Sequence, residues 1–328
     1  MEAGMSHIVG MGLKVPDKVL TNEYFSEYFK EDLSGFLEGI VGQKERHWLA
    51  DDESVVDLCL PAAQEAMAEA GITAKDLSMV VVASDTHEYI SPPTSLVVQG
   101  KLGAINAMIF DLSASCASFV TALVTVDSWF RSHSDFKYAL LIGEYGMTKY
   151  VDKDDKYTAS LFADGAAAFI IENTGESLMA SKFIADGTYH DYLGVFGGGT
   201  KYPINDDTLA KGLHKLRILK KYDENPNLVA WPGLVKSLME KVGEPLDAID
   251  LILFTQINLA VIKKVLEILG IPESKSHWIM DRYGYTGSAC IPMALYDARK
   301  QGKVKPGDLV VLVASGAGQA MGAVALRL

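Results

Sequence analysis

The chain repeats one order of predicted elements, and this repeat constrains the fold more than any other feature of the sequence. Each copy runs through strand, helix, strand, aspartate, a turn of small residues, helix and strand. The landmarks of the first copy are Leu77, Gly103, Asp111 and Tyr138, and those of the second are Ile249, Gly270, Asp281 and Leu309. Two copies of one unit indicate a duplication whose halves pack around a shared core.

Short apolar runs predict the central strands of both copies. They are continuous and not alternating, and they cover residues 79–83, 138–142, 167–171, 251–254 and 309–313. Such runs are typical of strands that are covered on both faces. Helices are predicted between them, for example over 55–70 and 260–269. Strands that alternate with helices predict an α/β fold with parallel sheet.

Composition excludes several classes of protein. The chain has 328 residues, 49% of them hydrophobic, and a formal net charge of −12, which argues against a nucleic-acid partner. No window is apolar for long enough to span a membrane, and the N-terminal residues do not resemble a secretory signal. Cys59, Cys116 and Cys290 are too scattered for a disulfide framework or a zinc site. We therefore expect a reduced, cytoplasmic protein without a metal or membrane partner.

Cys116 is the first candidate for a catalytic residue. It lies in a run of small residues where a predicted strand ends and a helix begins. The N-terminus of that helix would direct free N–H groups and its positive end at the thiol. This lowers a thiol pKa and favours the nucleophilic thiolate. A cysteine that only packs in the core is the alternative, and the local sequence leaves both open.

Several segments carry a resemblance to a known family. They are IVGMG at 8–12, GQKER at 42–46, the Cys116 run, FADGA at 162–166, FTQIN at 254–258, DRYGYTG at 281–287 and the glycine-rich end. With them the chain resembles, nearly end to end, the thiolase superfamily and within it the 3-oxoacyl-[acyl-carrier-protein] synthase III (ketoacyl synthase III) family. The resemblance implies a thiolase-like five-layer αβαβα fold with mixed, mainly parallel sheets. It places Cys116 in a half at 1–175, and Thr255 and Tyr285 in a half at 176–328.

The resemblance also implies a reaction. In the family, the cysteine takes an acyl group from a thioester, and a malonyl thioester then decarboxylates and attacks the acyl-cysteine. The family's catalytic histidine and asparagine are replaced here by Thr255 and Tyr285, so the Cys-His-Asn triad is incomplete. Their hydroxyls remain possible donors to a developing oxyanion, an effect worth about 3–4 kcal/mol each, but neither supplies the base that histidine provides. We expect acylation of Cys116 with altered condensation.

Two further catalytic assignments follow. Asp85 comes after the first strand of its copy, where the related hydroxymethylglutaryl-CoA synthases carry a catalytic glutamate. A carboxylate in a partly dry cleft does acid–base work; an aspartate that caps a turn is the alternative. The family's oxyanion hole, formed by two backbone N–H groups, corresponds to Cys116 and to Ala317, where the family has glycine.

Four residues align with substrate-binding positions of the family. Phe36 replaces a tryptophan that stacks on adenine, and Lys156 replaces an arginine near the diphosphate of coenzyme A. Ser91 replaces a phenylalanine that bounds the acyl pocket, in a segment that resembles the one crossing to the partner subunit. Asn258 ends the motif that begins at Thr255. The donor is a coenzyme A thioester or an acyl carrier protein, whose acidic surface would need a basic patch such as Lys211, Lys215, Arg217, Lys220 and Lys221, or Lys263 and Lys264. A solvated helix face is the alternative reading of these lysines.

We therefore predict an enzyme of fatty acid or polyketide biosynthesis, an acyltransferase resembling 3-oxoacyl-[acyl-carrier-protein] synthase III that is acylated on Cys116. Two alternatives remain open: an acyltransferase that does not decarboxylate its acceptor, and a non-catalytic partner subunit of a ketosynthase. We expect a homodimer with thioester substrates, no cofactor and no metal.

Overall fold

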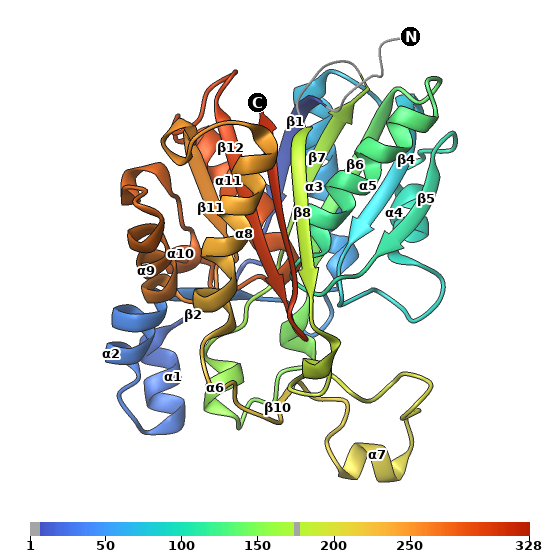
Figure 1. The fold of residues 1–328 in the computed structure, drawn as a ribbon. Helices are drawn as coiled ribbons and strands as arrows, with labels where there is room; N and C mark the ends of the chain where they lie inside the picture. The colour runs from blue at the N-terminus through green and yellow to red at the C-terminus, as the bar shows by residue number, and fades with distance from the viewer. Residues whose placement is uncertain (1–6, 174–177) are drawn as a thin grey trace.

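Two β-sheets form the frame of the protein (Figure 1). The computed structural model describes residues 7–173 and 178–328. The first sheet has the order β1-β7-β6-β4-β5 and the second the order β11-β12-β13-β8. Their strands are β1 (His7–Lys14), β4 (Leu77–Ala83), β5 (Met108–Leu112), β6 (Tyr138–Tyr145), β7 (Gly165–Glu172), β8 (Leu178–Ala185), β11 (Leu251–Phe254), β12 (Leu309–Gly316) and β13 (Ala320–Arg327).

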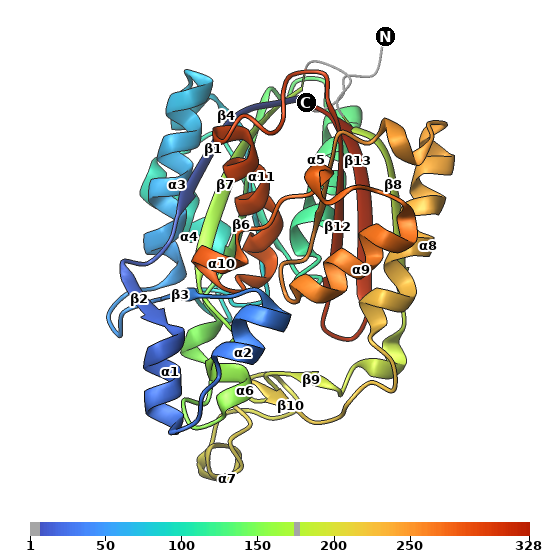
Figure 2. The ribbon, with the colours of Figure 1, turned by 90° about the vertical axis from the view of Figure 1, so that its left-hand side faces the viewer.

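Helices cover both sheets and fill the space between them, as Figure 2 shows from the side. The outer face of the first sheet carries α3 (Val55–Ala70) and α4 (Thr94–Leu102), and that of the second carries α8 (Pro226–Val242) and α9 (Leu259–Leu269). Between the sheets lie α5 (Ser118–Ser132) and α11 (Cys290–Lys300). The expected five-layer αβαβα architecture is confirmed.

Smaller elements surround this frame. They are β2 (Lys18–Thr21), β3 (Glu45–Trp48), β9 (Leu193–Gly194), β10 (Arg217–Ile218), α1 (Asn22–Phe29), α2 (Ser34–Phe36), α6 (Lys156–Ala159), α7 (Asp206–Ala210) and α10 (Met280–Tyr283). β2 pairs with β3 and β9 with β10, both antiparallel. Most of these elements lie together at one end of the two sheets (Figure 1).

The continuous apolar runs are explained by burial on both faces. In β4, Met79, Val81 and Ala83 belong to the core between the sheets, whereas Val80 and Val82 belong to the core under α3 and α4. Side chains alternate across a strand, so every position of a doubly covered strand must be apolar. β12 repeats this arrangement between the central core and the core under α8 and α9.

Two sequence expectations about the sheets need correction. The sheets are mixed, as expected, but in the described residues three pairings of the large sheets are parallel and four are antiparallel, because β1, β7, β8 and β13 run against their neighbours. The strand expected before Asp281 is reduced to one isolated bridge between Ile252 and Ser276. The second sheet therefore has no counterpart of β5 among the described residues.

The predicted boundary between residues 175 and 176 lies outside the described residues. On either side of it, β7 belongs to the first sheet and β8 to the second. The two halves share the central core, to which both α5 and α11 contribute.

Candidate active site

One cavity of about 500 Å³ collects the residues that the sequence predicts to be catalytic. Its lining includes Cys116, Asp85, Thr255, Tyr285 and Ala317. Asp85 and Thr255 follow the ends of β4 and β11, and Ala317 follows β12, so strand ends from both sheets converge here. Ligand sites of α/β proteins typically lie at such strand ends.

The turn that carries Cys116 is tight and strained. Ser115 has a φ of 51°, a left-handed conformation that non-glycine residues rarely adopt. The Ser118 hydroxyl fixes the turn by accepting the Ala114 N–H (2.8 Å) and donating to the Ser115 carbonyl. A Cβ at Gly316 would lie 2.6 Å from the Ala114 oxygen. The loop after β12 thus approaches the Cys116 turn so closely that only glycine fits at 316.

Cys116 is half-buried as a residue and lines the cavity. Burial of its sulfur, with the nearby charge of Asp85, raises the pKa of the Cys116 thiol well above its ordinary value. The sequence expectation of a lowered pKa is therefore wrong in direction: desolvation and a neighbouring carboxylate outweigh the start of α5. Cys116 carries its proton at neutral pH and needs a proton acceptor to become a nucleophile.

Two tyrosines contact the cysteine. The hydroxyls of Tyr285 and Tyr145 hydrogen-bond the Cys116 sulfur, which lowers its pKa against the larger effect of burial. Their rings pack against Phe162, with centroids 5.4 Å and 6.4 Å away. Sequence analysis missed Tyr145, although its place at the end of β6, beside the other strand ends, was a usable signal.

Asp85 is a carboxylate in a dry site. Its Oδ1 is buried and has no hydrogen-bond partner among the described residues. Burial raises the pKa of Asp85 to about 6. Behind it lies Glu144, fully buried at the end of β6, whose carboxyl accepts a hydrogen bond from the Thr86 hydroxyl (3.4 Å). Burial raises the pKa of this second carboxyl well above its usual range. Glu144 was not predicted from the sequence.

Thr255 connects the ends of two strands. Its Oγ1 accepts the backbone N–H of Ser315 at 2.9 Å, so the hydroxyl proton remains available for donation. Ala317, two residues after Ser315, is not among the described residues with a positive φ. Alanine therefore replaces glycine at 317 without backbone strain, and its N–H keeps a regular orientation.

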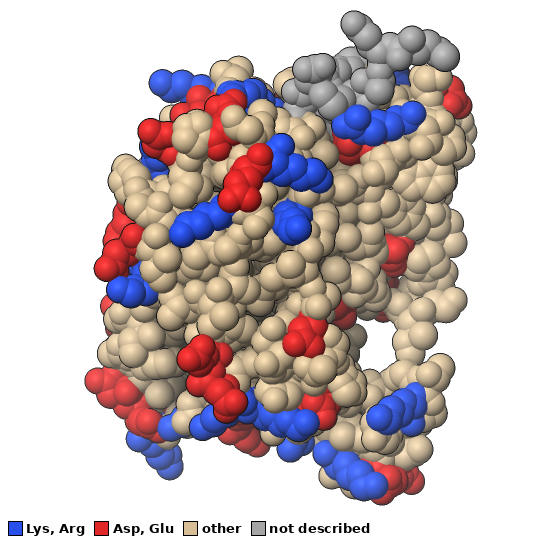
Figure 3. Space-filling view, in the orientation of Figure 1, with Lys and Arg blue, Asp and Glu red and all other residues tan. Residues whose placement is uncertain are grey.

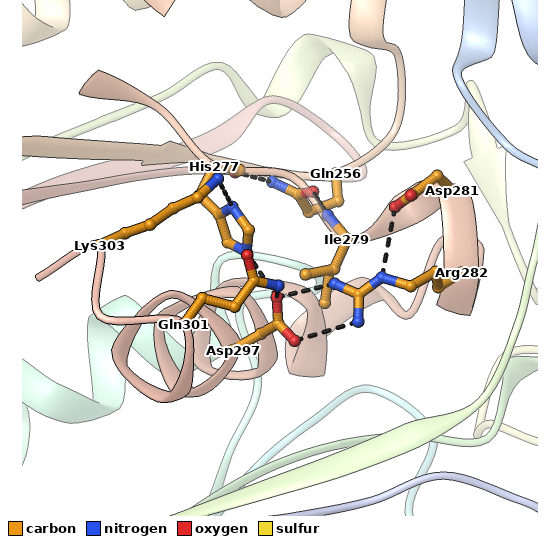
Figure 4. Close-up of polar contacts among 8 residues, drawn as sticks. All are labelled: Gln256, His277, Ile279, Asp281, Arg282, Asp297, Gln301 and Lys303. Carbon is orange, nitrogen blue, oxygen red and sulfur yellow. Dashed lines mark hydrogen bonds and ion pairs between the residues drawn. The ribbon is translucent and has the colours of Figure 1, made fainter. Parts of the chain in front are cut away.

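A buried polar network holds the segment that leads to Tyr285 (Figure 4). The Gln256 amide donates to the Phe254 and His277 carbonyls (2.9 and 3.3 Å) and accepts the Ile279 N–H (2.9 Å). The His277 ring contacts a carboxylate at 2.6 Å and a lysine amine at 2.8 Å. These partners are Asp297, which also binds Arg282 and Gln301, and Lys303. None of them lines the cavity, so the network positions the site and does not touch substrate.

The four predicted substrate-binding residues lie outside the lining of the cavity. Phe36 and Ser91 are exposed, and Lys156 forms an ion pair with Glu31 at 2.6 Å. Asn258 caps α9, because its side-chain oxygen accepts the Val261 N–H. Their contacts with substrate remain predictions.

Metal sites and membrane-spanning helices are two further features to consider. Residues 7–173 and 178–328 contain no group of three or more histidine, cysteine, aspartate and glutamate side chains arranged to hold a metal ion. Within the same residues, no helix has both the length and the apolar character needed to cross a membrane.

The five layers, the duplicated halves and a cysteine at converging strand ends define the thiolase-like class of α/β proteins. Family models narrow this class. The model "3-Oxoacyl-[acyl-carrier-protein (ACP)] synthase III" matches residues 110–187, and its C-terminal counterpart matches residues 239–328. The chain belongs to the 3-oxoacyl-[acyl-carrier-protein] synthase III family. The predicted family and its enzyme class, the acyltransferases, are confirmed.

Individual relatives cover nearly the whole chain. A β-ketoacyl-[acyl-carrier-protein] synthase III from Symbiobacterium thermophilum is 34% identical over 98% of this chain and 97% of its own length. The enzyme of that name from Caulobacter vibrioides is also 34% identical, over 98% and 99%. The crystal structure of 3-oxoacyl-[acyl-carrier-protein] synthase III from Aquifex aeolicus has a TM-score of 0.88 at 30% identity and covers 98% of this chain and 100% of its own.

Proposed function

We propose that this protein is an acyl-thioester transferase and condensing enzyme, acylated on Cys116, whose condensation machinery is altered. The observation that carries the proposal is the surrounding of the sulfur: Cys116 lines a cavity and receives hydrogen bonds from Tyr285 and Tyr145. A subunit that only supports another enzyme has no need for these features.

Asp85 is the proposed proton acceptor. With a pKa of about 6, its carboxyl is ionised at neutral pH, whereas the Cys116 thiol is not. As the sulfur attacks a thioester carbonyl, its proton moves toward Asp85, which accounts for a carboxylate with an unpartnered oxygen in the cavity. The backbone N–H groups of Cys116 and Ala317 are the proposed oxyanion hole.

Thr255 and Tyr285 are the proposed donors during condensation. Each has a hydroxyl at the cavity, and such donors stabilise the enolate that forms as a malonyl thioester loses carbon dioxide. With no imidazole in this position, we expect condensation to be slower than acylation.

The donor is proposed to be a thioester of coenzyme A or of an acyl carrier protein, with no further cofactor. Basic and acidic side chains are interspersed on the face in Figure 3. Several lysines considered as a carrier-docking patch are ion-paired, namely Lys211, Lys220, Lys263 and Lys264. Pairing reduces the net positive charge that an acidic carrier meets, so both donors belong in the test.

A cytoplasmic homodimer in fatty acid or polyketide biosynthesis completes the proposal. Support for the dimer comes from the open edge of strand β5 and from exposed apolar side chains in the segments that join β4 to β5: Ile90 is 90% exposed and Ile105 is 73% exposed. Large apolar side chains left in solvent are candidates for burial in an interface.

Intact-mass measurement tests the proposed function. After incubation with acetyl-CoA or an acetylated carrier protein, the protein should gain one acyl group, and Cys116→Ala should gain none. Release of carbon dioxide from a malonyl thioester then separates a condensing enzyme from a transferase that leaves its acceptor intact. If the wild-type protein gains no mass from either donor, it is a non-catalytic subunit and the proposal fails.

A further inference from the structure

A second cavity, of about 380 Å³, adjoins the catalytic cavity. Tyr222, Pro226 and Gln319 line both, so the two meet at a common boundary. Asp223 and Glu224 also line the second cavity, and neither takes part in an ion pair within the described chain. This hollow therefore presents two carboxylates without an ion-pair partner among the described residues, next to the catalytic cavity.

Three tyrosines supply the aromatic part of its lining, and we name the hollow the tyrosine pocket. The ring centroids of Tyr189, Tyr192 and Tyr222 lie 4.9, 5.0 and 5.4 Å from one another. All three side chains are only half-buried, so the rings form one aromatic surface that remains open to the pocket. The face of an aromatic ring is electron-rich and attracts cations.

The same tyrosine cluster already binds one cation of the protein. The Lys220 ammonium lies 5.2 Å from the Tyr192 ring centroid and 2.7 Å from an Asp191 carboxylate oxygen. Lys220 does not line the tyrosine pocket. The pocket lining itself combines tyrosine rings with the Asp223 and Glu224 carboxylates and includes no lysine or arginine.

The chemistry of the pocket selects among possible ligand ends. A phosphate or carboxylate would be repelled by Asp223 and Glu224. A plain hydrocarbon would cover the rings but would desolvate the two carboxylates without compensation. An ammonium group suits both the rings and the carboxylates, because it can lie over the ring faces and form ion pairs with the carboxylates.

We propose that the tyrosine pocket binds the ammonium-bearing end of the acyl group that is transferred to Cys116. This inference rests on the proposed function. In the transfer, a bond forms between the Cys116 sulfur and the acyl carbon, and the bond from that carbon to the donor sulfur breaks. The thiol proton of Cys116 ends on the departing donor thiol.

A matched pair of substrates tests the inference. The N-acetylcysteamine thioesters of 4-(trimethylammonio)butyrate and 5,5-dimethylhexanoate have the same shape, and only the first carries a positive charge. We expect intact-mass kinetics to show acylation of Cys116 about tenfold faster with the charged thioester. This ratio corresponds to a cation–π and ion-pair contact of about 1.4 kcal/mol. Equal rates, or a preference for the neutral thioester, would overturn the inference.

Removal of the two carboxylate charges tests whether the preference for the charged thioester arises in the tyrosine pocket. In Asp223→Asn/Glu224→Gln the ratio of the two rates should fall toward one. The control, Glu23→Gln/Glu27→Gln, removes the same charge from exposed positions on α1 and should keep the ratio. An unchanged ratio in the first variant would show that the preference does not arise from this pocket.

Equilibrium binding separates this inference from the proposed function. Isothermal titration of tetramethylammonium chloride into the Cys116→Ala protein should show saturable binding that is lost in the added Asp223→Asn/Glu224→Gln changes. If tetramethylammonium binds but no thioester acylates the wild-type protein, the cation site stands and the acyl-transfer function fails. If acetyl-CoA acylates Cys116 but tetramethylammonium does not bind, the function stands and the tyrosine pocket is not a cation site.

Discussion

The two copies of the repeat place a cysteine at matching turns but give it opposite surroundings. Cys116 precedes α5, is partly exposed and lines the cavity. Cys290 begins α11, is fully buried, and its sulfur accepts the Gln256 N–H at 3.5 Å. Burial raises the pKa of Cys290 to about 12. The same order of elements thus yields a cavity-lining cysteine in one copy and a core cysteine in the other.

The residues after the first strand of each copy differ in the same way. Asp85 follows β4 and leaves a carboxylate oxygen unpartnered at the cavity. Gln256 follows β11 at the matching position, but its amide is fully engaged by Phe254, His277 and Ile279. The two copies thus share an order of elements, but only Asp85 of this matching pair lines the cavity, whereas Gln256 is used in holding the core.

Replacement of each cysteine by alanine, in two separate variants, is expected to give the largest difference between the copies. Cys116→Ala should lower acylation by roughly 10³-fold or more, because the nucleophile is lost. Cys290→Ala should keep acylation within about twofold and reduce the free energy of unfolding by about 1 kcal/mol. Intact-mass kinetics and urea unfolding measure the two effects. Loss of acylation in Cys290→Ala would contradict the assigned difference.

Gln256→Glu places a carboxylate in the second copy at the position that Asp85 occupies in the first. The oxygen that replaces the amide nitrogen would face the Phe254 and His277 carbonyls inside the core. We expect the free energy of unfolding at pH 7 to fall by about 3 kcal/mol, since a buried charge that faces two carbonyl oxygens is costly. Denaturant unfolding measures the change. A fully stable Gln256→Glu protein would show that this side is as tolerant as the cavity side.

Asp85→Asn sharpens the comparison through pH. The pKa of Asp85 is raised from 3.8 to about 6, so the folded protein binds this proton more tightly and loses stability as the pH rises from about 4 to about 6. The variant avoids this loss. It should therefore be more stable than the wild type at pH 8, by up to about 3 kcal/mol, and equally stable near pH 3.5.

Asp85→Asn should also be acylated more slowly at neutral pH. The rise in acylation rate that we expect near pH 6 in the wild type, where Asp85 ionises, should be absent from the pH–rate profile of the variant. Thermal unfolding and intact-mass kinetics across pH give both readings. A wild-type profile retained in Asp85→Asn would refute its role as proton acceptor.

Tyr285→Phe gives the smallest expected effect. It removes one hydroxyl donor to the Cys116 sulfur and keeps the ring against Phe162. Loss of this donor raises the pKa of the thiol, so acylation should slow about tenfold and its pH–rate profile should move to higher pH. Tyr296→Phe is the matched control, because its hydroxyl bonds Glu65 and does not line the cavity. An equal effect of both substitutions would argue against a direct contact with sulfur.

Periodic patterns in the sequence were sufficient for most of the frame. The runs at 79–83 and 309–313 became β4 and β12, and the helix expected over 55–70 became α3 with the same bounds. These elements are buried on predictable faces, so their patterns are local and strong. The prediction of a strand before Asp281 was wrong: only one isolated bridge, between Ser276 and Ile252, forms there.

The site was predicted in part. The pattern of strands indicated Cys116 and Asp85, and the family resemblance indicated Thr255; the structure brings all three into one cavity. Tyr145 and Glu144 were not predicted. Their place at the end of a predicted strand was the one usable signal, and no motif around them marks them as site residues.

The α/β order, the duplication and the residue types at each strand end follow from the sequence alone, because they depend on hydrophobic period and on local turn chemistry. Which side chains face the cavity, and how their pKa values shift, depends on how distant segments pack. Desolvation by distant segments raises the pKa of Cys116, where the sequence alone predicted a lowered value. Burial and charge at a point are set by residues far apart in the chain, and no local pattern records them.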